Sequence, residues 1–378
     1  MIPAEADFLL DSEVTYLNHG SFGATPETVF KVYQDWQRQL EFNPHKFVNN
    51  ELSSQLFIAR KHLADFLGTT TDKLAMVMNT TEGINTIARS LDLQPGDEIL
   101  GTNLMYGAMD RVWTFIAATK GCHYRKISLE LPLPDNQQLI EQIWREVSPN
   151  TRVILLDHIT SSTAFRMPLE EICTQAQARG IITIVDGAHA PGQIELNLDA
   201  LPVDYYVGNL HKWLCNPKSA GFIYSRDGID KVTPLTISWG WQSNKFFGFK
   251  SAHEWMGTRD YAAWLTISKT IEIFKQHNTE DNRQTYHRLL TRAQLEITNL
   301  SGLVSIYASP VQMANQMVSL LLPPSIVAKQ LQKRLLDEFN VVVLADNLEN
   351  IPLLRISIHR YNTDEDIDKL INALKICF

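Results

Sequence analysis

The sequence is poor in cysteine, has no long apolar run and carries no basic cluster, and each absence excludes a class of protein. No apolar stretch approaches the about 18 residues that a membrane-spanning helix needs, so we expect no transmembrane segment. The formal net charge is −8 at pH 7, which argues against nucleic acids and anionic membrane surfaces as partners. Residues 1–13 are acidic and lack the basic and apolar regions of a signal peptide, so we expect none.

The few cysteines indicate the compartment. They are scattered along the chain without a Cys-x-x-Cys pair, which predicts reduced thiols in a cytoplasmic protein and neither a disulfide framework nor a zinc knuckle. They are Cys122, Cys173, Cys215 and Cys377.

What the chain has is enough apolar material for two lobes. Hydrophobic residues make up 44% and charged residues 20% of 378 residues, which is typical of a globular protein larger than one ordinary domain. Across residues 74–225, short apolar runs alternate with helical patterns. The runs at 152–157 and 181–186 are apolar up to a final aspartate, which suits parallel strands buried on both faces. We therefore predict an α/β fold with a large, doubly wound, mainly parallel sheet.

The other elements follow from the same patterns. In the large lobe we predict strands at 74–78, 97–100, 205–207 and 222–224 and helices at 80–91 and 168–180. From about residue 260 we predict a smaller α+β lobe, with helices at 261–278, 285–302, 325–339 and 363–377 and strands at 316–323, 341–346 and 353–360.

Polar residues follow several of these strands, and in open α/β sheets ligands bind beyond the carboxyl ends of the strands. Thr80 and Thr81 lie at a predicted helix start, where free backbone amides and the helix dipole favour an anion such as phosphate. The alternative is an ordinary helix N-cap.

Asp186 ends a buried strand, and an ionised carboxylate there needs a cation or hydrogen bonds. His189 follows three residues later and can face the same cleft. The alternatives are a capping aspartate with a structural histidine, or a metal pair, although no third ligand stands at a recognisable spacing.

Lys212 lies at the tip between two apolar strands, among Tyr206, Trp213 and Leu214. A lysine in a water-poor site loses its proton readily and becomes a nucleophile that forms a Schiff base with an aldehyde. The alternative is a solvated surface lysine.

Together, a phosphate cradle, a carboxylate and a reactive lysine are what pyridoxal phosphate requires, because a carboxylate can keep the pyridine nitrogen protonated. Tyr106 follows the strand near residues 97–100 and can stack on the ring, or it can be an ordinary packing residue.

Five motifs then occur in an order found in a known family: TTEGIN (80–85), DGAHAPG (186–192), NLHKWL (209–214), GTRD (257–260) and RISIHRYNT (355–363). The chain resembles the class V aminotransferase group of pyridoxal-phosphate enzymes, fold type I, from residue 16 to residue 363. That group includes cysteine desulfurases, isopenicillin N epimerase and cysteine or cystine C–S lyases. The stretches LNHGSFG, FNPHKF, YGAM and WMGTRD look most similar to the isopenicillin N epimerase and C–S lyase branch.

The resemblance implies a role for each candidate residue. Lys212 carries pyridoxal 5'-phosphate as a Schiff base, and Asp186 pairs with the ring nitrogen. Tyr106 stacks on the ring, and His189 lies near the phenolic oxygen. Arg355 binds the substrate carboxylate through its planar fork. The cofactor phosphate is held by Thr80, Thr81, Asn209, His211 and, from a neighbouring subunit, Thr258.

The resemblance also implies three domains and a partner. Residues 1–17 form an N-terminal segment that packs on the small domain, residues 18–255 form the large cofactor-binding domain, and residues 256–378 form a long connecting helix and the small C-terminal domain. Because Thr258 reaches a neighbouring phosphate, we expect a homodimer with shared active sites that acts on a small amino-acid substrate.

Several reactions fit this site. Epimerisation at the α-carbon is the expectation, and it needs a second proton carrier opposite Lys212, for which Tyr106, His45 and His19 are candidates. The alternatives are C–S lysis and, less favoured, transamination. A cysteine desulfurase is disfavoured, because residues 301–355 contain no cysteine to act as its nucleophile. A binding protein that kept the fold and lost the reaction is opposed by the intact lysine and aspartate.

Overall fold

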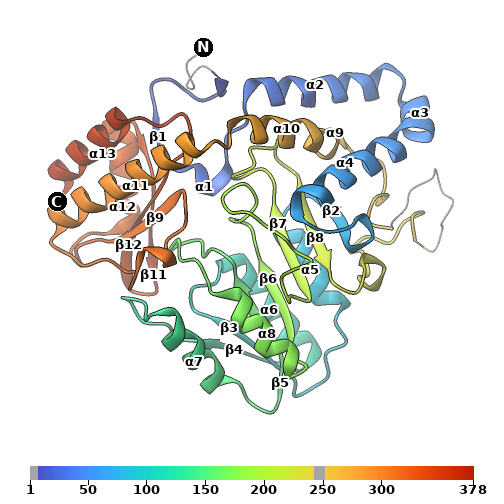
Figure 1. Cartoon of the computed structure of the whole chain (residues 1–378), viewed down its shortest axis with the longest axis horizontal. Coiled ribbons are helices and arrows are strands. Elements are labelled where there is room, and N and C mark those ends of the chain that lie inside the picture. Colours follow the sequence, from blue (N-terminus) through green and yellow to red (C-terminus); the bar gives the residue numbers. More distant parts are fainter. Residues whose placement is uncertain (1–6, 242–251) are drawn as a thin grey trace.

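A computed structural model describes residues 7–241 and 252–378, and its centre is a seven-stranded sheet (Figure 1). The strands lie in the order β2-β8-β7-β6-β5-β3-β4. β8 is antiparallel to both of its neighbours, whereas β7, β6, β5, β3 and β4 are parallel to one another. The predicted doubly wound, mainly parallel sheet is therefore confirmed. In chain order the strands are β2 Leu74–Val77, β3 Glu98–Thr102, β4 His123–Ile127, β5 Thr151–Asp157, β6 Ile182–Asp186, β7 Tyr205–Asn209 and β8 Gly221–Ser225.

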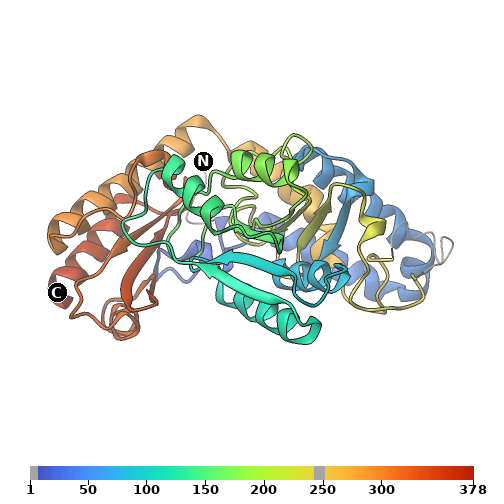
Figure 2. The same ribbon diagram turned by 90° about the horizontal axis from the view of Figure 1, so that it is seen from below.

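Helices cover both faces of this sheet because its central strands are apolar on both sides. Val153 and Leu155 of β5 belong to the core under α5 and α6, whereas Ile154 and Leu156 point the other way, into the core under α4, α7 and α8. Figure 2 shows the blue-green α6 on one side of the sheet and the green α7 and α8 on the other. These helices are α4 Leu52–Leu67, α5 Thr80–Ser90, α6 Gly107–Lys120, α7 Asn136–Glu146 and α8 Leu169–Ala178.

The helix α5 lies unusually close to the sheet. Its predicted apolar face is confirmed, since Ile84, Ile87 and Ala88 are buried. A Cβ added at Gly83 would lie 2.4 Å from Cγ1 of Val207 in β7, so only glycine allows this approach. The close packing fixes the N-terminus of α5 above the carboxyl end of β7.

The small lobe is a three-stranded antiparallel sheet in the order β11-β12-β9, covered by three helices (Figure 1). Its elements are α11 Glu280–Ser301, β9 Met317–Leu321, α12 Ala328–Phe339, β11 Leu344–Leu348, β12 Ile351–Ser357 and α13 Asp364–Cys377. The N-terminal strand β1 (Thr15–Tyr16) pairs in parallel with β10 (Val341–Val342) of this lobe. That pairing supports the predicted packing of the N-terminal segment on the small domain. Residues 1–6 of this segment and residues 242–251 of the predicted large domain lie outside the described residues.

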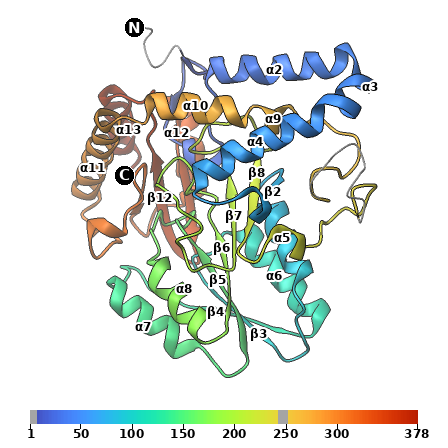
Figure 3. The same ribbon diagram turned by 45° about the vertical axis from the view of Figure 1, so that its right-hand side comes forward.

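Several N-terminal helices were not predicted. α2 (Glu27–Phe42) leads through α3 (Pro44–Lys46) and a π-helical turn (Phe47–Glu51) into α4. Figure 3 shows α4 and α10 (Ile267–His277) side by side above the sheet. The short helix α1 (His19–Phe22) lies between the two lobes (Figure 1).

Three local predictions were wrong. The expected helix 261–278 is two helices, α9 (Ala262–Leu265) and α10, separated at Thr266. The expected strand 341–346 is divided between β10 and β11. Gly208 and Asn209 continue β7 instead of ending it, because Gly208 serves close packing: an added Cβ would lie 2.5 Å from the Phe222 ring.

Within residues 7–241 and 252–378, none of the helices combines the length and apolar character needed to cross a bilayer.

Candidate active site

Lys212 lies in the loop between β7 and β8, and its amine is in a water-poor site. Its Nζ lies 3.0 Å from Nε2 of His189. Burial, and next the positive charge of Arg355, lower the pKa of Lys212 to about 7, against the opposing influence of Asp186 and Asp157. About half of such an amine is in the neutral, nucleophilic form at pH 7.

Two carboxyl groups lie side by side at the ends of neighbouring strands. Asp157 of β5 and Asp186 of β6 are register partners. Oδ1 of Asp186 accepts a hydrogen bond from the Ala188 amide at 2.8 Å. Burial raises the pKa of Asp186, and burial followed by the charge of Asp186 raises the pKa of Asp157 well above its usual value. Asp157 was not predicted as a site residue, although its position at the end of the 152–157 run was the available signal.

The ring of His189 is oriented by Trp213. Nε1 of Trp213 donates a hydrogen bond to Nδ1 of His189 at 3.2 Å, so the proton of the neutral imidazole is on Nε2, the atom that faces Lys212. Burial, and then the charge of Lys212, lower the pKa of His189 well below its usual value. His189 is thus a neutral donor towards a neutral amine.

Two buried polar atoms that could bind a ligand belong to Thr80, at the start of α5, and to His211, which follows β7. Asn79 is the N-cap, because its Oδ1 accepts a hydrogen bond from the Glu82 amide, so the Thr80 side chain does not cap the helix. The buried Oγ1 of Thr80 and Nδ1 of His211 have no hydrogen-bond partner in the described part of the chain. The Thr80 amide donates to Oδ1 of Asn209 at 2.9 Å, so Asn209 holds the helix start in place. Donors at a helix N-terminus suit an anion.

Two of the predicted phosphate residues are exposed, and His211 is uncharged. Thr81 is exposed on the first turn of α5. Burial lowers the pKa of His211 to about 4, so its imidazole is neutral and acts as a hydrogen-bonding group. Thr258 is exposed, as a residue that reaches across a subunit interface would be in a single chain, and its contact with a neighbouring phosphate stays a prediction.

Arg355 of β12 is a buried cation held by neutral oxygens. Its Nη1 donates to the Ser161 carbonyl at 2.8 Å, and its Nη2 donates to Oδ1 of Asn18 at 3.1 Å and to Oγ of Ser21 at 2.9 Å. Arg355 is 2% exposed, and no acidic residue forms an ion pair with it in residues 7–241 or 252–378. Burial lowers its pKa to about 10. A buried guanidinium without an anion is suited to a ligand carboxylate. Asn18, Ser21 and Ser161 were missed by the sequence analysis.

Tyr106 is the N-cap residue of α6 and acts electrostatically on Arg355. Its backbone forms a hydrogen bond with the Asp157 carboxyl, whereas its side chain is 51% exposed. The ring is therefore free of tight core packing, which is compatible with a covering role and not with the alternative of an ordinary packing residue.

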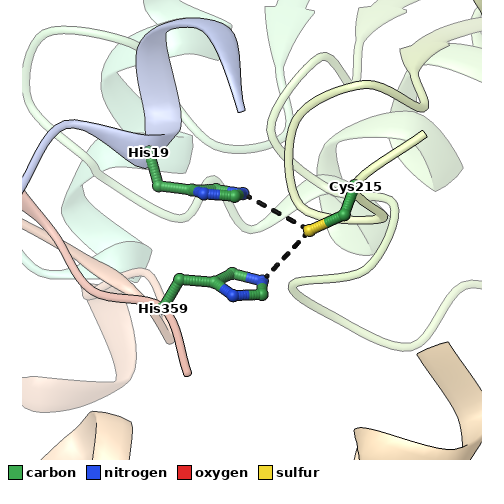
Figure 4. A group of neighbouring side chains, drawn as sticks. All are labelled: His19, Cys215 and His359. Atoms are coloured by element: carbon green, nitrogen blue, oxygen red, sulfur yellow. Dashed lines mark hydrogen bonds between the residues drawn. The ribbon is translucent and has the colours of Figure 1, made fainter. Parts of the chain in front are cut away.

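His19, Cys215 and His359 form a buried cluster (Figure 4) that contacts the backbone of Lys212 through His19. Sγ of Cys215 lies 3.4 Å from Nε2 of His359 and 3.7 Å from Nε2 of His19. Nε2 of His19 also donates to the Lys212 carbonyl at 3.0 Å, while the Tyr361 hydroxyl donates to Nδ1 at 2.9 Å. The two imidazoles are stacked, with centroids 4.2 Å apart and planes 20° apart. One ion cannot lie in both ring planes, as imidazole ligands require, so the cluster is a hydrogen-bonded support for the lysine loop.

Comparison with known proteins gives consistent results. The family model described as Aminotransferase class-V matches residues 15–370. The chain is 31% identical to an isopenicillin N epimerase of Streptomyces clavuligerus over 98% of this chain and 96% of that protein. It is 24% identical to an L-cysteine desulfhydrase of Arabidopsis thaliana over 96% and 87%. Among solved structures, the complex of the cystine C–S lyase C-DES with its product cysteine persulfide has a TM-score of 0.82 at 22% identity, over 96% of this chain and 98% of that chain.

Proposed function

The chain belongs to the class V aminotransferase family of pyridoxal-phosphate enzymes, and from this premise we propose that Lys212 carries the cofactor and that the cleft acts at the α-carbon of an amino acid. The observation that carries the proposal is the surroundings of one amine. Nζ of Lys212 lies 3.0 Å from a neutral His189, and its pKa is lowered to about 7. Two carboxyl groups, and an arginine that forms no ion pair within the described residues, act on the same site.

The residues present fit pyridoxal 5'-phosphate. The unpartnered Oγ1 of Thr80 and Nδ1 of His211 are hydrogen-bonding groups for the phosphate at the N-terminus of α5. Asp186, fixed by the Ala188 amide, is the anion for a protonated ring nitrogen. Thr81, Asn209 and Thr258 remain proposed phosphate neighbours on the strength of the family alone.

When bound, pyridoxal phosphate supplies an aldehyde and an electron-withdrawing ring that accepts the electron pair of a broken α-carbon bond. The residues of this chain do the remaining work. Arg355 binds and orients the substrate carboxylate. Lys212, as a neutral amine, takes the α-proton as general base. His189 keeps its Nε2 proton directed at the lysine, because Trp213 occupies Nδ1.

Epimerisation is the reaction that the comparisons favour, because an isopenicillin N epimerase matches at 31% identity along 98% of this chain. C–S lysis is the second candidate, because L-cysteine desulfhydrases are also among the relatives. Transamination is less favoured. A desulfurase stays disfavoured: residues 301–355 contain no cysteine, and burial raises the pKa of the Cys215 thiol to about 12, which makes it a poor nucleophile.

The structure narrows the candidates for a second proton carrier. His19 is fully buried and hydrogen-bonded to Tyr361 and to the Lys212 carbonyl, which removes it. His45 is exposed on α3, beyond the 16-residue helix α2. Tyr106 and His45 therefore stay candidates, and His45 could act from a neighbouring subunit.

We also propose a homodimer with shared active sites in the cytoplasm. The exposed Thr258 and the half-exposed Tyr106 support a dimer with shared active sites. Four free cysteines among the described residues support a cytoplasmic location.

Product analysis distinguishes the reactions. The holoenzyme is incubated in heavy water with cystine, cysteine conjugates and aminoadipyl peptides. α-Proton exchange without pyruvate supports epimerisation, pyruvate release supports C–S lysis, and a keto acid with the amine form of the cofactor supports transamination. Absence of all three products with these substrates would contradict the proposal, provided that the Lys212→Ala control and the wild type have the same fold by circular dichroism.

A further inference from the structure

Asp157 is a buried carboxyl group that the reaction above does not use. It ends β5, and its register partner Asp186 ends β6. Directly paired residues of parallel strands point to the same face, so both carboxyl groups face the lysine loop. Both act electrostatically on Lys212.

The order of the strands indicates which part of the cofactor Asp157 faces. The proposed phosphate residues Thr80 and His211 follow β2 and β7, on one side of β6. Asp157 and Tyr106 follow β5 and β3, on the other side. In pyridoxal phosphate, the phosphate arm and the ring oxygen lie on opposite sides of the line from the ring nitrogen to the aldehyde carbon. With the nitrogen at Asp186 on β6, the oxygen edge faces β5.

One oxygen of Asp157 is free to bond there. The residue is 3% exposed and its carboxyl forms a hydrogen bond with the Tyr106 backbone. Oδ2 has no hydrogen-bond partner in the described part of the protein. A buried polar atom without a partner in a candidate ligand site indicates a missing ligand atom.

We propose that Asp157 is a neutral carboxylic acid in the working enzyme and that its Oδ2 hydroxyl donates a hydrogen bond to the ring oxygen of the cofactor. The inference rests on the proposed function, because it requires the cofactor on Lys212. Asp186 then carries the charge for the ring nitrogen while Asp157 contributes a donor and no charge. Two adjacent buried carboxylates repel each other, and desolvation opposes ionisation of both.

The charged and titratable groups that act on Asp157 set its protonation. Burial and Asp186 favour the neutral acid, whereas Lys212 and the backbone hydrogen bond favour the anion. On the β4 side, Tyr124 is affected by the Asp157 charge, and burial is the main cause of its raised pKa. These groups come from Asp186 on β6, Lys212 after β7, Tyr124 on β4 and the backbone of Tyr106, the N-cap of α6.

Two substitutions distinguish a neutral donor from an anion. Asp157→Asn keeps a neutral donor of the same shape, and Asp157→Ala removes the donor. The absorbance of the Lys212–cofactor linkage is titrated with pH in each holoenzyme. A hydrogen bond donated to the ring oxygen makes that oxygen a weaker acceptor for the proton on the linkage nitrogen, and so lowers the pKa of the linkage. We therefore expect Asp157→Asn to leave the midpoint nearly unchanged, and Asp157→Ala to raise it by about one pH unit, equivalent to one lost hydrogen bond.

Shifts of the midpoint in the opposite direction would overturn the inference. An ionised Asp157 would stabilise the protonated linkage, so both substitutions would lower the midpoint. A midpoint unchanged in both variants would show that Asp157 does not contact this edge. As a readout that needs no cofactor, the isotope-edited infrared spectrum of the apoenzyme should contain a protonated-carboxyl band that Asp157→Asn removes, and its absence would also overturn the inference. Failure of the proposed function itself is distinguishable, because the wild type would then show no linkage absorbance at all.

Discussion

The pH dependence of cofactor attachment should report the altered basicity of Lys212. Its pKa is about 7 and the ordinary value is 10.5. At pH 7 about half of this amine is neutral, compared with roughly one in three thousand for an ordinary lysine, so its reactive population is larger by about a thousandfold. Apoenzyme is mixed with limiting pyridoxal phosphate at each pH, and the rate of linkage formation is followed by absorbance.

Two references make this test sharp. N-acetyl-lysine corrects for the ionisations of the cofactor, and Lys212→Ala apoenzyme gives the contribution of every other amine. The corrected rate should rise with pH and level off with a midpoint near 7. Arg355→Met should raise that midpoint, because the Arg355 charge is the second cause that lowers it. A midpoint near 10.5, the ordinary lysine value, would refute the reasoning.

Two further substitutions test the residues that support the site. Trp213→Phe removes the donor to Nδ1 of His189, which allows the ring proton to leave Nε2; we expect a higher Lys212 midpoint, whereas a merely structural role would lower only the melting temperature. Gly83→Ala places a Cβ 2.4 Å from Cγ1 of Val207 and should lower the free energy of unfolding by about 1–3 kcal/mol. Because it displaces the start of α5, it should also weaken cofactor binding. The control Ala88→Gly on the same helix should lower stability and leave cofactor binding unchanged.

The sheet could be predicted from sequence because its signals are local. β5 and β6 are mainly apolar and end in aspartate, and α5 has a regular apolar face. The position of Lys212 between β7 and β8 followed from two short apolar strands close in sequence. Each of these features is contained within a few consecutive residues.

The parts that sequence did not reveal depend on contacts between distant segments. Arg355 is held by Asn18 and Ser21, which lie more than 300 residues away in the chain. Asp157 gains its importance from the register of β5 with β6, which the sequence pattern does not specify. Gly208 looks like a strand breaker, yet it serves close packing against Phe222.

The most direct test of the central claim is the identity of the lysine that carries the cofactor. The holoenzyme is reduced with borohydride, digested, and its peptides are mapped by mass spectrometry. The account predicts a single reduced cofactor adduct on Lys212, absent from Lys212→Ala. An adduct on nearby Lys218 or on any other lysine, with Lys212 unmodified, would contradict it.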